Sequence, residues 1–183
     1  MSAPPIAHAG AHAGARDLAL ATLHEWYRGE VGGEALFLAL DVAATDRNQA
    51  AKWRTLAALE CATKQLLASA IFQLDGQLPT SQPDPDLAPD RVAALAGQSW
   101  PELMHWLERI AADALEVMTR EAGTLPAELA TLSAWVLDHE RALIDFARRE
   151  LAGATAHSLD CAQAMLARAV PGTTAATVTR ANR

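Results

Sequence analysis

The sequence predicts an all-α protein built from two long helical hairpins that a crossover joins, with a short fifth helix near the C-terminal end. Three observations indicate this fold. Apolar residues recur at alternating spacings of three and four through most of the chain, which is the period of an α-helix with one buried face. Alanine and leucine dominate, and no segment shows the apolar and polar alternation of a strand. Capping and helix-breaking residues divide the pattern into separate helices.

The first hairpin is expected from helices at about residues 16–44 and 46–74. A capping box of Asp46 and Gln49 starts the second of these helices. The pair at 75–76, aspartate and glycine, ends it. These signals predict two helices of similar length that lie antiparallel.

A proline-rich stretch at residues 77–90 predicts the crossover, and a short turn of helix is expected after it at 91–96. The second hairpin follows, with helices at about 99–123 and 127–151. A second capping box marks the start of the first helix of this hairpin. The short fifth helix is expected at 158–170, where a proline and a glycine stop it.

Length and composition indicate a single domain. The chain has 183 residues, of which 51% are hydrophobic, enough for one sizeable core. Residues 1–14 are mainly alanine, glycine, histidine and proline, and residues 171–183 are mainly threonine and alanine. Both ends therefore read as disordered tails around a helical domain at residues 15–170.

Charge and motifs exclude several classes of function. The net charge of −7 and the lack of a basic run argue against nucleic-acid binding. Cys61 and Cys161 lie in helical patterns without disulfide spacing, which favours reduced thiols and a cytoplasmic protein. No apolar run approaches a membrane span, and no secretory signal is apparent. Phosphate-binding glycine loops, zinc-spaced cysteine pairs and nucleophile elbows are not found either.

Two carboxylates lie on the expected buried face of the first helix. Glu30 and Glu34 are one turn apart and share that face with four apolar or aromatic residues, Leu20, Leu23, Tyr27 and Phe37. An unpaired buried carboxylate costs several kcal/mol, so such a pair needs cations, hydrogen bonds or protons. The pair is therefore a candidate site, with Tyr27 as a hydrogen-bonding neighbour.

The same feature recurs in the other helices. Glu60 lies in the middle of an apolar row on the second helix, formed by Trp53, Leu56, Thr63, Leu67 and Ile71. His139 has the same central place in a row of the fourth long helix, formed by Leu129, Leu132, Val136, Leu143 and Phe146. Glu108 lies between two apolar rows of the third long helix, so the pattern allows it to face the core or the solvent. Closure of the bundle would bring these residues to a similar depth.

The segment Gly29-Glu30, the mid-helix Glu60, the crossover and the pair His139-Glu140 resemble the ferritin-like superfamily, and within it the rubrerythrin-like branch. The resemblance covers about residues 17–151. In that family two Glu residues and two Glu-x-x-His motifs hold two iron or manganese ions. By resemblance, Glu30 matches the ligand of the first helix, Glu60 the Glu of the first motif, and His139 the His of the second. Glu34 and Glu140 are extra acids beside these positions, and Glu34 is an alternative to Glu30 on the first helix.

Each motif keeps one half only, because Thr63 stands where the first His is expected and Val136 where the second Glu is expected. The resemblance implies iron or manganese as cofactor, with oxygen or peroxide chemistry as the reaction class of an oxidoreductase. The ligands expected on this basis are Glu30, Glu34, Glu60 and His139, with Glu108 and Glu140 as further candidates. The residues expected behind the ligands are Tyr27, Thr63 and Asp138.

Less specific interpretations stand beside this one. A single Glu on an apolar face often reaches solvent or pairs with an arginine, and a single core His is often only hydrogen-bonded. A second hypothesis is a non-catalytic helical bundle that lost its metal and serves as a binding or assembly module. A second apolar row on the first and third long helices also predicts a homodimer. Membrane partners are not expected, and the small-molecule substrate stays open.

Overall fold

The computed structural model describes residues 7–74, 77–80 and 89–169, and within them the chain is all-helical, as predicted. Six α-helices and two 3-10 turns are found in this part of the chain. In order they are α1 (Ala7–Ala43), α2 (Arg47–Leu74), α3 (Pro89–Ala96), α4 (Trp100–Ala122), η2 (Ala127–Leu129), α5 (Ala130–Leu151), η3 (Thr155–His157) and α6 (Asp160–Ala169).

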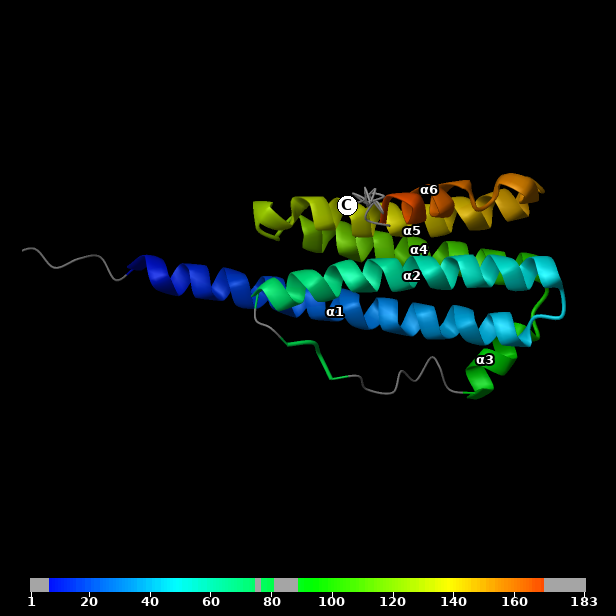
Figure 1. The fold of residues 1–183 in the computed structure, drawn as a ribbon, viewed down its shortest axis with the longest axis horizontal. Coiled ribbons are helices and arrows are strands. Elements are labelled where there is room, and N and C mark those ends of the chain that lie inside the picture. The colour runs from blue at the N-terminus through cyan, green and yellow to red at the C-terminus, as the bar shows by residue number, and fades with distance from the viewer. Residues whose placement is uncertain (1–6, 75–76, 81–88, 170–183) are drawn as a thin grey trace, which may run out of the picture.

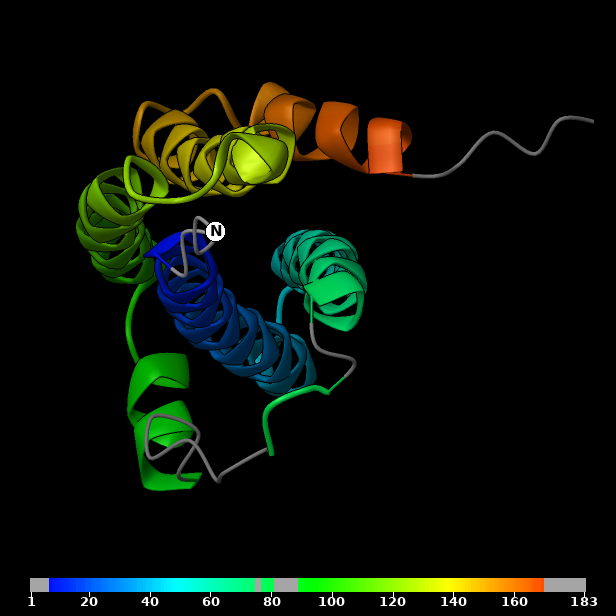
Figure 2. The same cartoon turned by 90° about the vertical axis from the view of Figure 1, so that its left-hand side faces the viewer.

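The four long helices α1, α2, α4 and α5 run side by side along the longest axis of the molecule (Figure 1). α1 packs closely against α2, and α4 packs closely against α5, so each pair is an antiparallel hairpin. α6 lies against α2 and α5, whereas α3 contacts α1 (Figure 2). The end of α2 and the short helix α3 lie at opposite ends of the bundle (Figure 1), as a crossover between the hairpins requires.

Most helix boundaries agree with the predicted ones. The side chain of Asp46 accepts hydrogen bonds from the backbone N–H of Asn48 at 2.7 Å and of Gln49 at 3.0 Å, which caps α2. The backbone N–H of Ser99 donates to Glu102 at 2.8 Å at the start of α4. Gly153, after α5, has a φ of 78°, which is readily adopted only by glycine.

The N-terminal boundary differs from the prediction. α1 begins at Ala7, so helix includes half of the segment 1–14 that was expected to be a disordered tail. The alanine content of this segment explains the difference, because alanine has the highest helix propensity. Residues 1–6 and 170–183, which hold the rest of the predicted tails, lie outside the described residues.

The core has two apolar regions. One contains Phe37, Trp53, Trp100 and Phe146, whose rings stack or meet edge to face at centroid distances of 5.2 to 6.4 Å. The other contains Leu20, Leu23, Trp26, Leu67, Ile71 and Val136. Five buried polar residues lie in sequence between members of these two regions: Glu30 on α1, Glu60 and Thr63 on α2, and His139 and Glu140 on α5. A polar layer therefore divides the core.

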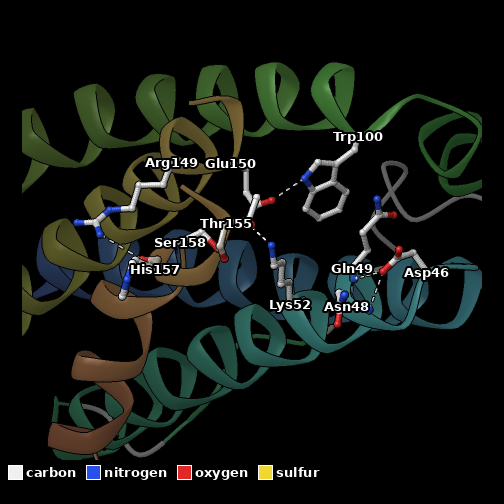
Figure 3. Close-up of polar contacts among 10 residues, drawn as sticks. All are labelled: Asp46, Asn48, Gln49, Lys52, Trp100, Arg149, Glu150, Thr155, His157 and Ser158. Carbon is white, nitrogen blue, oxygen red and sulfur yellow. Dashed lines mark hydrogen bonds and ion pairs between the residues drawn. The ribbon is translucent and has the colours of Figure 1, made fainter. Parts of the chain in front are cut away.

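A second buried polar group ties three helices together at another level of the bundle. The carboxylate of Glu150 on α5 accepts a hydrogen bond from Lys52 on α2 and one of 2.8 Å from the indole N–H of Trp100 on α4 (Figure 3). Its side chain is 1% exposed, and that of Lys52 is 14% exposed. Both carboxylate oxygens have partners, so this group is a satisfied structural ion pair.

The predicted second apolar row is only partly covered. Leu36 and Leu40 on α1 and Leu107 on α4 are buried, whereas Leu38 and Val117 are exposed by 46% and 42%. The homodimer stays a prediction. In the described residues no helix is both long enough and apolar enough to cross a membrane.

Candidate metal centre

The inner face of α2 is the one that the sequence predicts. Its buried residues include Trp53, Leu56, Glu60, Thr63, Leu67 and Ile71, all six members of the predicted row. On α5 the predicted row is buried from Val136 to Phe146, and Leu129 and Leu132 are partly exposed. Glu60 and His139 are therefore core residues.

The inner face of α1 is rotated slightly from the predicted one. Trp26, Glu30, Phe37 and Leu40 are buried, while Tyr27 and Glu34 are only partly buried at its edge. Glu30 thus points into the bundle, and Glu34 does not.

Glu30, Glu60 and His139 meet in the polar layer. His139 Nε2 lies 3.2 Å from Glu60 Oε1 and 3.7 Å from Glu30 Oε2, and the three residues are at most 5% exposed. One ligand atom from each of the three lies within 4.8 Å of the other two. Glu30 Oε2 is fully buried and has no hydrogen-bond partner. Such an atom is costly unless something else binds it, because it has lost its water.

A glycine makes room for this cluster. A Cβ atom at position 33 of α1 would lie 2.4 Å from Glu60 Oε2 and 2.7 Å from its carboxyl carbon. Glycine inside a helix costs about 1 kcal/mol relative to alanine, so its use here has a local reason. The group that approaches α1 most closely at this glycine is the Glu60 carboxylate.

His139 is oriented by residues behind it. Its Nδ1 lies 2.9 Å from Thr63 Oγ1, and the same oxygen accepts a hydrogen bond of 2.9 Å from the indole N–H of Trp135. With Nδ1–H donating to Thr63, Nε2 faces the two carboxylates and is the atom available to a metal. Thr63 was expected behind the ligands. Trp135 was not expected there. The signal in the sequence for its contact with Thr63 is its spacing of four residues from His139, which places both on one face of α5.

The electrostatics follow from burial and from the neighbouring acids. Burial alone would lower the pKa of His139, but the carboxylates of Glu30, Glu60 and Glu140 outweigh it and raise this pKa to about 10. Burial raises the pKa of Glu30 well above its ordinary value; His139 opposes this rise and Glu60 adds to it. The imidazolium of His139 is thus the main counter-charge of the cluster.

Glu140 is a fourth buried group of this layer. It is 6% exposed and close enough to His139 to raise the pKa of that residue. Burial raises its pKa to about 7; His139 opposes the rise and Glu60 adds to it. Glu140 is the second residue of the predicted His139-Glu140 pair and completes a set of three carboxylates and one imidazole.

The other candidate residues are not brought to the cluster. Glu34 pairs with Lys64 at the edge of the hairpin, and Tyr27 lies close enough to Lys64 to affect its pKa. Glu108 pairs with Arg148 at 2.7 Å, and Asp138 pairs with Arg141 at 3.0 Å. Each acid lies where an oppositely charged side chain and solvent stabilise it better than the core does. The expectations of Glu34 and Glu108 as ligands and of Asp138 and Tyr27 behind them are therefore not supported.

Comparison with known proteins gives no assignment: no family model matches the chain, and no curated protein or solved structure matches it significantly. What the cluster can do must be inferred from its chemistry. Carboxylate oxygens and one imidazole form a donor set suited to iron or manganese. The buried Glu30 oxygen, which has no hydrogen-bond partner, is the atom of this set that a bound ion would satisfy.

Proposed function

We propose that the chain is a ferritin-like metalloprotein that binds an iron or manganese ion through Glu30, Glu60 and His139. In this proposal α1, α2, α4 and α5 correspond to the four-helix bundle of that superfamily, and α6 is the additional short helix. Glu140 is a further ligand or a charge partner of the bound ion. The other predicted acids have no part in the site.

One observation carries the proposal. Ligand atoms from three separate helices converge to within 4.8 Å of one another in a fully buried place. Two carboxylates and an imidazole at this spacing match the separation of ligands around one ion. The buried Glu30 oxygen without a hydrogen-bond partner lies in this group and would gain a ligand bond.

The donor set favours one ion. The two-ion arrangement of the superfamily draws a carboxylate from each of its four helices. Here α4 offers apolar residues to the centre, because Glu108 lies outside and pairs with Arg148. A redox-active ion held by so few protein ligands keeps open positions for oxygen or peroxide, which is the oxidoreductase chemistry that we propose.

A second candidate function has its own support. The 3.2 Å contact between His139 and Glu60 is an ion pair that needs no metal. A metal-free bundle with this internal ion cluster would be a binding or assembly module. In that case the raised pKa of Glu30 would keep it protonated and satisfied inside the core.

Metal analysis of protein purified without an affinity tag separates the two functions. The proposal predicts uptake of one Fe²⁺ or Mn²⁺ per chain and its loss in Glu30→Gln and Glu60→Gln. Glu34→Gln is the matched control on α1, because Glu34 pairs with Lys64 outside the cluster. If Glu30→Gln and Glu60→Gln bind as much metal as Glu34→Gln, or if the wild type binds none, the proposal is contradicted and the metal-free module is favoured.

A further inference from the structure

A pocket opens directly beside the cluster. It has a volume of about 290 Å³ and lies between α1 and α4, with Glu30, Glu60 and Glu140 among its lining residues. In the described part of the chain α1 and α4 make few close backbone contacts. The pocket therefore occupies a gap in the bundle.

Small residues on both walls keep this gap open. Gly29, Gly32 and Gly33 line it on the α1 side, and Ala111 and Ala114 line it on the α4 side. Gly29 is exposed, and a Cβ atom added there would meet no heavy atom within 4 Å, so this lining residue lies where the pocket meets solvent. Gly33 admits the Glu60 carboxylate, whereas the exposed Gly29 lines the pocket without a contact to the cluster.

Apart from the three acids, the lining is nearly all apolar. Trp106, Leu107, Ile110 and Met118 contribute from α4, and Leu36 and Phe37 contribute from α1. Arg91, which is exposed at the surface, is the one basic side chain among the lining residues. Among the uncharged lining residues, the indole N–H of the partly buried Trp106 is the one conventional hydrogen-bond donor. Such a wall favours a hydrocarbon surface over a polar one.

We propose that this pocket binds a small, uncharged, hydrocarbon-rich molecule and presents it to the metal centre. The inference rests on the proposed function, because the bound ion would be the group that such a molecule meets at the polar end of the pocket. The size follows from the volume of about 290 Å³. A cavity of about 150 Å³ lined by Leu, Ile and Phe holds benzene, so this one has room for a chain of about eight to ten carbons.

Binding of 1-octanol, followed by proton NMR and calorimetry, tests this inference. We expect the metal-free protein to bind 1-octanol in preference to octylammonium and octanoate. Ala114→Leu should weaken this binding about tenfold by filling the pocket. Ala112→Leu on the exposed face of the same helix is the matched control. If Ala114→Leu folds poorly, Gly29→Leu replaces it, because this substitution adds a side chain where the pocket meets solvent and should hinder entry.

Paramagnetic broadening then tests the link to the metal. When Mn²⁺ is bound, the resonances of 1-octanol should broaden, and they should stay sharp with Zn²⁺. Binding of 1-octanol without broadening by Mn²⁺ would overturn the inference. A preference for octylammonium, or binding of 1-octanol by Ala114→Leu as tight as by the wild type, would overturn it as well. If Mn²⁺ binds and 1-octanol does not, this inference fails and the proposed function stands. If Mn²⁺ itself does not bind, the proposed function fails, and the inference fails with it.

Discussion

The carboxylate of Glu60 occupies the space that a side chain at position 33 would fill, since a Cβ there would lie 2.4 Å from Glu60 Oε2. The two residues belong to different helices of one hairpin, so the glycine sets where the carboxylate rests. The spacing between α1 and α2 at Gly33 therefore decides where the candidate ligand Glu60 lies.

Gly33→Ala should therefore weaken metal binding without unfolding the protein. The carboxylate is the free end of a flexible side chain and can move aside, and alanine favours the helix by up to about 1 kcal/mol. Gly29→Ala makes the same chemical change one turn earlier, where nothing lies within 4 Å. Mn²⁺ titration should show an affinity loss of about tenfold or more in Gly33→Ala only. Equal affinities in the two variants would show that the position of Glu60 is not important.

Metal affinity should rise with pH. The ion must displace the proton from His139 Nε2, and the pKa of this group is raised to about 10. Between pH 7 and pH 10 we expect His139 to release about one proton per ion, which corresponds to about a tenfold gain in affinity per pH unit. Glu30, whose pKa burial also raises, adds to this release wherever it is protonated. Below pH 7 the dependence should steepen if Glu140, with a pKa of about 7, is also a ligand. Calorimetry in buffers of different ionisation enthalpy measures this release, and an affinity independent of pH would exclude His139 as a ligand.

The metal-free protein has a pH dependence of its own. His139 has a folded pKa above its unfolded value, so its stabilising contribution is complete below about pH 6.5 and is lost as the pH rises through about 10. Glu140 also has a raised pKa, so the fold favours its protonated form, and this contribution is lost between about pH 4.5 and about pH 7. Urea unfolding should thus show stability that falls from neutral to alkaline pH, and His139→Gln should remove the alkaline part of the fall.

Thr63→Val should reduce metal affinity by about 10- to 100-fold, the usual effect of losing a residue that orients a ligand. Valine has nearly the same shape, but it leaves the N–H groups of Trp135 and His139 without their shared acceptor. The free energy of unfolding should fall by about 1–3 kcal/mol for the same reason. Thr63→Ser keeps the hydroxyl and should retain most of the affinity. Wild-type affinity in Thr63→Val would mean that the orientation of His139 does not depend on this oxygen.

The ion pair of Glu150 and Lys52 should behave as a purely structural feature. Lys52→Met leaves the buried carboxylate of Glu150 with Trp100 alone, and we expect a loss of about 3–5 kcal/mol in unfolding free energy. Glu150→Met should cost less, because the ammonium of Lys52 is partly exposed and can reach water. Along α5, Glu150 lies about 16 Å from His139, so metal affinity should not change in either variant. The reverse order of stabilities would show that Lys52 is the more strongly buried charge.

Sequence alone predicted the helices and the inner faces of α2 and α5, because each face is a single apolar row that only Glu60 and Thr63, or His139, interrupt. It predicted the face of α1 less well. Trp26 and Tyr27 are adjacent aromatic residues, and a row of residues at helical spacing can be drawn through either of them. The row that contains Trp26 and Gly33 faces the core only because α2 and α5 pack against that side of α1. Sequence spacing therefore could not choose between Glu30 and Glu34.

The position of Glu108 depends on a partner that is remote in sequence. Arg148 lies 40 residues away and draws this carboxylate to the surface of the α4 and α5 hairpin. The partners of Glu34 and Glu60 are equally remote, since Lys64 and His139 belong to other helices. Helical periodicity places a residue on one face of its helix. Tertiary packing then decides which charged side chain pairs with it, and this pairing cannot be predicted from spacing.

The most direct test of the metal centre is a crystal structure of the protein soaked with Fe²⁺ or Mn²⁺, with anomalous data at the absorption edge of the metal. The account predicts one anomalous peak about 2 Å from an oxygen of Glu30, an oxygen of Glu60 and His139 Nε2. The contact between His139 and Glu60 should open to admit the ion. An anomalous map without a peak there, with His139 still paired to Glu60 at about 3.2 Å as in the present structure, would contradict it.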